Sequence, residues 1–241
     1  MKKYFYLFLF TALFLGNSVD VLAETKLYQG MGQTSNLRMG PGKDKKEVNV
    51  YSLNYVTASA IFDADGKIVN LIVDILELST PNYDGASMPH FSGWPETQGL
   101  NVTDHTSGEV TGVSENTLEN ITKEVAEWKT KRDRGTNYGM NPQNEWNKQM
   151  DFYQNFFKGK TIAEIEAWFN KSTSDKNGKP LKENATMEID KEKYAKLSED
   201  EKKVLVDVIA GATMSLKDNH GDILGAIKKA YENRVEFLLP N

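Results

Sequence analysis

The chain of 241 residues contains no cysteine. That absence excludes disulfide bonds, cysteine-ligated iron–sulfur clusters, c-type haem attachment and a lipid-modified N-terminal cysteine. The three histidines, His90, His105 and His220, are too scattered to indicate a metal site. A net charge of −5 argues against nucleic acid as a partner. The remaining composition, 39% hydrophobic and 26% charged, is that of a globular protein with one moderate domain or two small ones.

Signatures of catalysis are also missing. No Ser/His/Asp order indicates a triad, and no segment repeats. The basic, glycine-rich stretch 40–43 lacks the spacing and the Lys-Ser/Thr pair of a Walker A motif. Asp63, Asp65 and Gly66 resemble the start of a calcium loop, but no glutamate follows at the required position, so a plain turn is favoured. We therefore predict neither catalytic residues nor a metal site.

The N-terminus has the layout of a secretory signal peptide. Two lysines precede an apolar run, Tyr4 to Leu15, that is too short for a comfortable membrane span. Small residues around Ala23 then supply a cleavage site before Glu24. We predict a signal peptide over residues 1–23, which would make the mature protein extracytoplasmic, either secreted or in the cell envelope. An uncleaved anchor is the alternative. A secreted protein without cysteine is more typical of a bacterium.

The central part of the chain predicts an α+β fold. Residues 48–78 are rich in β-branched and aromatic residues on both sides of the turn signature at 63–66, which indicates a hairpin. The glycine-containing residues before it, about 25–47, predict a loop or an irregular strand. We expect helices over 114–133, 144–157, from Thr161, from Ser198, and over 221–237. The expected architecture is a small twisted, mainly antiparallel sheet with packed helices and a helical insertion at about 114–190.

Two features of these segments have open interpretations. The first helix is expected to begin at Ser114, and its basic end is interpreted as a solvated helix C-terminus; this end comprises Lys129, Lys131, Arg132 and Arg134. Prolines at 81, 89 and 95 exclude regular structure over residues 79–99. The same loop is too apolar for a solvated linker, so it either packs on the body or lines a ligand site.

One short stretch near the C-terminus, residues 207–215, combines small residues with hydroxyls between two helix-like segments. We expect it to form the start of a helix, with the Thr213 side chain presented there. The unpaired N–H groups and positive dipole end of a helix start favour a phosphate, and Gly211 and Ala212 would let it approach closely. The alternative is that Thr213 or Ser215 is simply an N-cap.

The full stretch, Asp207-Val-Ile-Ala-Gly-Ala-Thr-Met-Ser215, resembles the flavinylation motif of the FMN-binding domain family, which includes the C subunit of sodium-pumping NADH:quinone reductase. In that family a flavin transferase joins the phosphate of FMN to the motif threonine. The resemblance implies that Thr213 carries covalent FMN, with Asp207 as the acidic recognition position. Gly211 and Ala212 would form a compact turn, and Ser215 is the second candidate acceptor.

The resemblance has weaker anchors elsewhere. Ala210 stands where serine or threonine is commoner in the motif. A hairpin with a turn like residues 65–68 precedes the motif in the family, and Thr80-Pro81 matches a turn that approaches the flavin in relatives. A flat, mostly apolar isoalloxazine ring needs an aromatic wall, for which Tyr83 is a candidate. The resemblance thus implies one FMN-binding domain over residues 24–241.

The implied function is an extracytoplasmic electron carrier that works with membrane or extracellular redox partners. Whether such a protein is an enzyme is open, because the cofactor does the redox chemistry and the chain has no evident substrate of its own. Two alternatives remain. The first is a secreted domain that binds FMN or another small ligand non-covalently, as a sensor or scavenger. The second is an envelope protein that has the fold but no flavin.

Overall fold

The computed structural model describes residues 26–85, 88–140 and 144–238. The predicted signal peptide, residues 1–23, lies outside these ranges. Within them, no helix has the length and apolar character that crossing a membrane would require.

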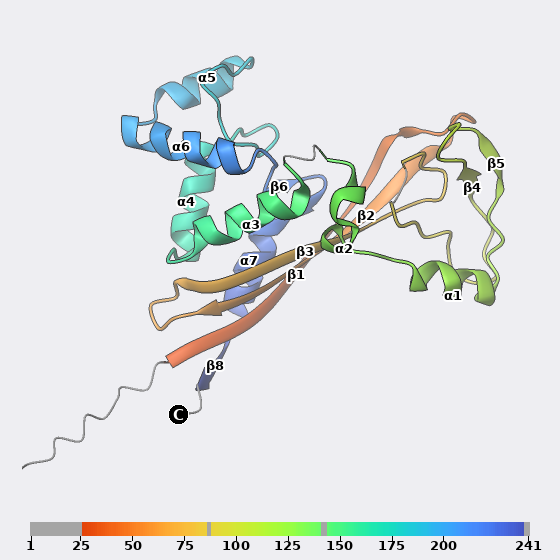
Figure 1. The fold of residues 1–241 in the computed structure, drawn as a ribbon, viewed down its shortest axis with the longest axis horizontal. Helices are drawn as coiled ribbons and strands as arrows, with labels where there is room; N and C mark the ends of the chain where they lie inside the picture. The colour runs from red at the N-terminus through yellow and green to blue at the C-terminus, as the bar shows by residue number, and fades with distance from the viewer. Residues whose placement is uncertain (1–25, 86–87, 141–143, 239–241) are drawn as a thin grey trace, which may run out of the picture.

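A four-stranded antiparallel sheet organises the molecule, with the strand order β3-β2-β1-β8. Its three long strands run diagonally through the structure, and the short β8 lies beside the start of β1 (Figure 1). The strand bounds in the large sheet are β1 (Lys26–Lys43), β2 (Asn49–Phe62), β3 (Ile68–Ser79) and β8 (Val235–Leu238). Two small hairpins add β4 (Asn101–Thr103) with β5 (Val110–Val113), and β6 (Lys217–Asp218) with β7 (Gly221–Asp222). The predicted α+β class is confirmed.

The hairpin of β2 and β3 forms where the sequence predicts it. Its turn is closed by the Asp63 carboxylate, which accepts hydrogen bonds from the backbone N–H groups of Asp65 (3.0 Å) and Lys67 (2.8 Å). The aspartates at this position are therefore turn residues, as expected.

Strand β1 is more regular than the sequence indicates. It pairs with β2 from Tyr28 opposite Phe62 to Met39 opposite Tyr51, and its register shifts only between Met39 and Lys43. Its glycines obscure the strand pattern but have a packing reason. A Cβ at Gly30 would overlap the carbonyl of Ala230 in the last helix, so the helix lies directly on the strand backbone there.

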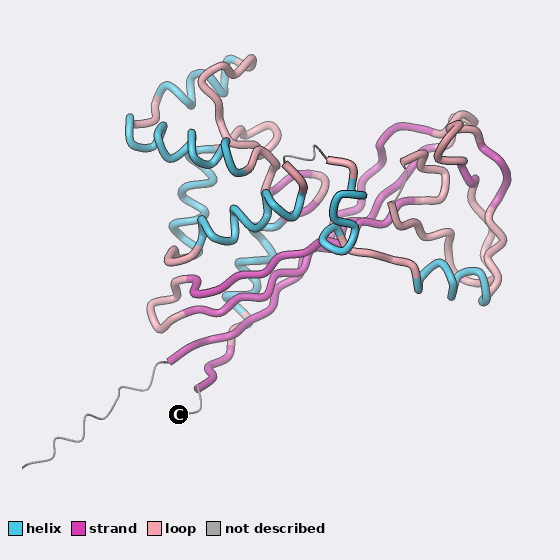
Figure 2. The backbone as a smooth tube through the Cα atoms, in the orientation of Figure 1, coloured by secondary structure: helices cyan, strands magenta, loops and turns pink. Residues whose placement is uncertain are grey.

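Helices gather over one end of the sheet, while β4, β5 and α1 form a smaller lobe at the other end (Figures 1 and 2). The helices are α1 (Leu118–Ala126), α2 (Lys131–Arg134), α3 (Trp146–Phe157), α4 (Ile162–Ser172), α5 (Glu188–Ala195), α6 (Glu199–Gly211) and α7 (Ile223–Glu232), with a 3-10 turn at Gly135–Tyr138. The helices expected from Thr161 and from Ser198 begin at those residues, and each start is closed by a capping box.

Two of the expected helices have different boundaries in the structure. The first helix begins after Thr117, whose side chain accepts from Asn120 N, and not at Ser114. It ends at Ala126, and a short separate helix, α2, then carries the basic residues. The last helix ends at Glu232 instead of Phe237, because Val235–Leu238 pairs with the first residues of β1 and completes the sheet.

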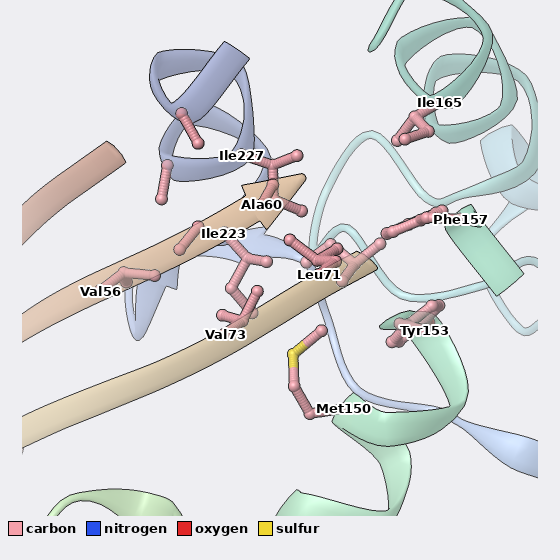
Figure 3. Close-up of a cluster of buried hydrophobic side chains, with 14 of the residues drawn as sticks. Val56, Ala60, Leu71, Val73, Met150, Tyr153, Phe157, Ile165, Ile223 and Ile227 are labelled. Atoms are coloured by element: carbon pink, nitrogen blue, oxygen red, sulfur yellow. The ribbon is translucent and has the colours of Figure 1, made fainter. Parts of the chain in front are cut away.

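The core lies between one face of the sheet and helices α3, α4 and α7. Figure 3 shows side chains from α3 and α4 turned toward β3, and side chains from α7 turned toward β2. Members of this cluster that are almost fully buried include Val56, Leu71, Val73, Met150, Tyr153, Phe157, Ile165 and Ile227. The aromatic residues that the sequence places at helical spacing are thus mainly core residues.

Candidate functional site

The 207–215 stretch does not start a helix. Helix α6 runs through Asp207 to Gly211, and Ala212 is its C-cap. The next helix start lies at Ile223, where the Asp222 side chain already caps it by accepting from Gly225 N at 2.8 Å. The prediction of a helix start at Thr213 is therefore wrong. The physical reason is that the apolar run before the motif extends α6 up to the small residues, which then end it.

Helix α3 holds the motif segment in place. The buried Gln149 side-chain oxygen accepts hydrogen bonds from the backbone N–H groups of Thr213 (2.8 Å) and Met214 (3.0 Å). The Tyr153 hydroxyl donates to the Met214 carbonyl at 3.1 Å. Burial raises the pKa of Tyr153, so the phenol stays protonated and remains a donor. The conformation after α6 is thus fixed by two side chains that are distant in the sequence.

The small residues of the motif are explained by packing. A Cβ at Gly211 would overlap the ring of Phe152 in α3. Ala212 is almost completely buried in the main core. Asp207, by contrast, is exposed on α6, and no hydrogen bond or ion pair joins its side chain to another described residue. Asp207 is therefore accessible to another protein, whereas Gly211 and Ala212 serve the fold.

Thr213 and Ser215 line a cavity of about 220 Å³ between α2, α3 and the β6–β7 hairpin. One wall is apolar and aromatic, formed by Tyr138, Met140 and Trp146. Charged or ionisable groups on the lining, besides the Tyr138 phenol, are Lys131, Lys179, His220 and Asp218, and the Asp218 carboxylate lies 3.2 Å from the His220 ring. The Ser215 hydroxyl accepts from Lys217 N at 3.1 Å, whereas no hydrogen bond of the Thr213 hydroxyl is found within the described residues.

Lys131 is only 2% exposed, which corrects its interpretation as part of a solvated helix end. Its ammonium group lies 3.0 Å from a carboxylate oxygen of Glu77, and the Arg38 guanidinium lies 3.2 Å from the other oxygen. Burial alone would raise the pKa of Glu77, but Lys131 and Arg38 outweigh it and lower the pKa. Lys131, Glu77 and Arg38 therefore form a charged triad, and Lys131 connects it to the lining of the cavity.

The neighbouring basic residue, Arg132, is also committed to the fold. Its guanidinium donates to the Val73 carbonyl at 2.8 Å and to the Gln154 side-chain oxygen at 2.7 Å, and it pairs with Asp151 at 2.8 Å. Gln154 in turn accepts from Val73 N at 2.8 Å. The outer edge of β3 is thus covered by side chains of α2 and α3.

Beside the triad lies a buried amide. Asn54 faces Glu77 across the β2–β3 ladder and Asn36 across the β1–β2 ladder. The Asn36 amide donates to the carbonyl of Asp218, a residue of the cavity lining, at 3.3 Å. Asn54 is 0% exposed, and neither polar atom of its side chain has a hydrogen-bond partner among the residues that the structure describes. An unpaired buried amide lowers the free energy of unfolding, so other interactions in the protein must offset this loss.

Thr80 and Pro81 do not join the Thr213 cavity. The Thr80 hydroxyl oxygen accepts from Tyr51 N at 3.0 Å, and the Pro81 carbonyl accepts from Thr103 N at 3.0 Å. These contacts tie the aromatic loop to β2 and β4. Tyr83 comes closer to the triad: burial, followed by the negative charges of Asp84 and Glu77, raises its pKa. Tyr83 is therefore influenced by the charge of Glu77, but like Thr80 and Pro81 it does not line the Thr213 cavity.

In the described ranges, no three metal-ligating side chains come together as a metal site. The comparisons give one relative. The chain is 39% identical over 222 residues to a chlorophenol reductase of Desulfitobacterium hafniense, an alignment that covers 89% of this chain. The chain spans about 60% of the length of that protein. No family model and no solved structure matches.

Proposed function

We propose that this protein is an extracytoplasmic electron carrier whose FMN is joined through a phosphoester to Thr213. The observation that carries the proposal is the Asp207–Ser215 motif, whose threonine hydroxyl lines a cavity with an aromatic wall and several cations. The name of the relative, a reductase, supports a redox role. The predicted signal peptide supports the extracytoplasmic location. A covalent tether suits that location, because a dissociable cofactor would be lost by dilution outside the cell.

The residues of the cavity fit a flavin phosphoester in their chemistry. Lys179 is exposed and His220 half-exposed at the mouth, where a phosphodiester would keep one negative charge. Tyr138 and Trp146 offer flat apolar surfaces for a ring. The cavity of about 220 Å³ is smaller than the ~300–1,000 Å³ of sites that enclose a small molecule, so it would enclose only part of the cofactor.

The backbone around Thr213 stabilises a bound phosphate less than the start of a helix would. Thr213 follows the C-terminal, negative end of α6, which disfavours a phosphate by roughly 0.3–1 kcal/mol. The N–H groups of Thr213 and Met214 are already engaged by Gln149. The side-chain cations must therefore neutralise the phosphate. When bound, FMN would supply transfer of one or two electrons, and this chain would tether it, orient it and limit the access of water.

Attachment requires a partner enzyme, the predicted flavin transferase. The Thr213 oxygen would form a bond to the FMN phosphorus of FAD, the bond between the two phosphates would break, AMP would leave and the hydroxyl proton would pass to solvent. The exposed Asp207 lies in the last part of α6, six residues before Thr213, and is available for recognition by that enzyme. Electrons would then pass between membrane or extracellular redox partners.

The test is the intact mass and visible spectrum of the protein, produced with and without a co-expressed flavin transferase. We expect a mass gain of one FMN minus water in the wild type and in Ser215→Ala, and none in Thr213→Ala. Loss of the gain in Ser215→Ala alone would move the attachment site to that residue. Flavin that is released on denaturation would indicate non-covalent binding, and no flavin in any sample would refute the proposal.

A further inference from the structure

The large sheet has one covered face and one open face. Along β1 and β2, buried residues alternate with exposed ones, and the buried set faces α7 and the core. On the opposite face, Leu37 of β1 and Leu53 of β2 are 74% and 41% exposed, whereas Leu78, the β3 partner of Leu53, is only 7% exposed. The open part of this face therefore lies over β1 and β2. In an antiparallel sheet with one solvated face, that face is normally polar.

Here the open face is apolar. Three ladder pairs lie in successive rows: Met39 opposite Tyr51, Leu37 opposite Leu53, and Ser35 opposite Tyr55. We call the five apolar members of these rows the open-face patch, comprising Leu37, Met39, Tyr51, Leu53 and Tyr55. Met39 is 67% exposed and the two tyrosines about 40% each.

The part of the open face that β1 and β2 form also lacks charge. From Met31 to Met39 on β1 and from Tyr51 to Ile61 on β2, the outward residues are uncharged without exception, although 26% of the chain is charged. Charged side chains of the same strands, such as Arg38, point to the covered face. A charge-free strip this long is unusual for a surface that stays in water.

The area of the patch approaches what an interface needs. At the observed exposures, its five residues present on the order of 600 Å² to solvent, taking about 200–250 Å² for each fully exposed residue. The largest apolar patch on an ordinary monomer is ~300–600 Å², and a standard interface buries ~800 Å² per partner. The neighbouring uncharged residues of the same face, such as Gln33 and Thr57, would supply the remainder.

We propose that a second copy of this chain covers the open-face patch, so that two sheets pack face to face about a two-fold axis. A partner that docks by charge would require a cluster of complementary charges, whereas the charge that β3 adds beside Thr57 on this face is the single carboxylate of Asp74, which already accepts from Arg132 N at 3.2 Å. Two copies of the uncharged part over β1 and β2 need no such complementarity, and aligned sheets pack ~10 Å apart with interdigitated side chains. The Thr213 cavity lies on the covered side of the sheet and stays accessible in such a dimer. This inference does not depend on the flavin.

The test uses the absence of cysteine, since one introduced cysteine gives one possible cross-link. Leu37→Cys, Leu53→Cys and Tyr55→Cys are each oxidised with copper phenanthroline and compared with Val206→Cys, a matched apolar position that is 63% exposed on α6. A disulfide needs Cα atoms within about 7 Å, so only a position near the two-fold axis should cross-link. Analytical ultracentrifugation of the cysteine-free protein over a hundredfold concentration range measures the dimer directly.

We expect a dimer, at least one patch cysteine that cross-links efficiently, and no cross-link at position 206. Leu37→Glu and Leu53→Glu should raise the dimer dissociation constant at least a hundredfold while circular dichroism stays unchanged. A protein that remains monomeric throughout the range would overturn the proposal, as would a dimer insensitive to both glutamates. A monomer that binds lipid vesicles through the patch would equally overturn it, in favour of a membrane surface.

Discussion

The backbone N–H of Thr213 donates a 2.8 Å hydrogen bond to the side-chain oxygen of the buried Gln149, which lies 64 residues earlier in the chain. This bond and the neighbouring one from Met214 anchor the segment on which the proposed attachment depends. The position of the acceptor hydroxyl is thus decided by α3 and not by the motif alone.

Replacing Gln149 by leucine should destabilise the protein by about 1–3 kcal/mol, because it leaves two backbone donors without their acceptor. It should also reduce the rate at which the transferase modifies Thr213. Urea unfolding and timed intact mass spectrometry measure the two effects. Gln149→Glu keeps an acceptor oxygen and is the matched control; equal modification rates in the leucine variant and the wild type would show that the anchor is unimportant.

Gly211→Ala should destabilise the protein by about 1–3 kcal/mol, since the added methyl group overlaps the Phe152 ring. A second substitution, Phe152→Leu, should recover part of this loss, which a double-mutant cycle in chemical denaturation would reveal. Strict additivity of the two substitutions would argue that the glycine serves something other than this contact, such as approach of the transferase.

The buried pair of Lys131 and Glu77 predicts an asymmetric mutational response. Lys131→Met leaves a buried carboxylate with one partner fewer and should cost about 3–5 kcal/mol. The double variant Lys131→Met/Glu77→Gln removes both charges and should recover most of that stability, as followed by thermal unfolding. If the double variant were as unstable as the single one, the ion pair would not be the source of the loss.

The lowered pKa of Glu77 predicts a dependence of stability on acid. Because its folded pKa lies below the ordinary value of 4.5, Glu77 contributes stability that is fully present above about pH 4.5 and is lost as the pH falls through the folded pKa. Denaturation curves between pH 7 and pH 3 should show a smaller acid loss for Lys131→Met/Glu77→Gln than for the wild type. Parallel curves for the two proteins would contradict the assignment.

Asn54→Leu should raise stability, in contrast to most substitutions in a core. Its buried amide has no partner among the described residues, and an unpaired amide costs about 1–3 kcal/mol that a leucine of similar shape would not. Thermal unfolding of flavin-free protein is the measurement, with Ser52→Ala on the same face as a control, since the Ser52 hydroxyl accepts from Arg38 at 2.7 Å. A clear loss of stability in Asn54→Leu would reveal an unseen partner.

The sequence predicts the hairpin, the helix starts at Thr161 and Ser198 and the α+β class because these depend on local patterns of turn residues, caps and apolar spacing. Prediction from the sequence fails where contacts with a distant segment determine the local structure. The glycines of β1 predict a loop from the sequence, but in the structure they allow α7 to pack directly on the strand. The basic residues after α1 predict a solvated helix end, but in the structure Lys131 is buried against Glu77. Similarly, the conformation of Thr213 and Met214 after the end of α6 depends on hydrogen bonds to Gln149 and Tyr153 of α3.

The sequence singles out Thr213 and Ser215 as candidate acceptors, but it does not indicate which residues surround them. Thr213 and Ser215 both line the cavity, as the motif suggests. Lys179 and His220 come from turn regions without any distinguishing pattern, so only the fold brings them there. Gln149 gave a weak signal, as an uncharged polar residue inside a strongly aromatic helix. Thr80 and Pro81 match a family turn in sequence, yet their hydrogen bonds serve the aromatic loop.

The cover over the edge of β3 has a consequence for how the protein can associate. A strand that tried to extend the sheet past β3 would need the outward N–H and C=O of Val73, and Gln154 and Arg132 already occupy both. Recruitment of foreign strands, the first step toward fibrils, is therefore blocked at the middle of that edge. Variants of Arg132 should accordingly form thioflavin-positive aggregates more readily than the wild type, even under conditions where their folded state persists.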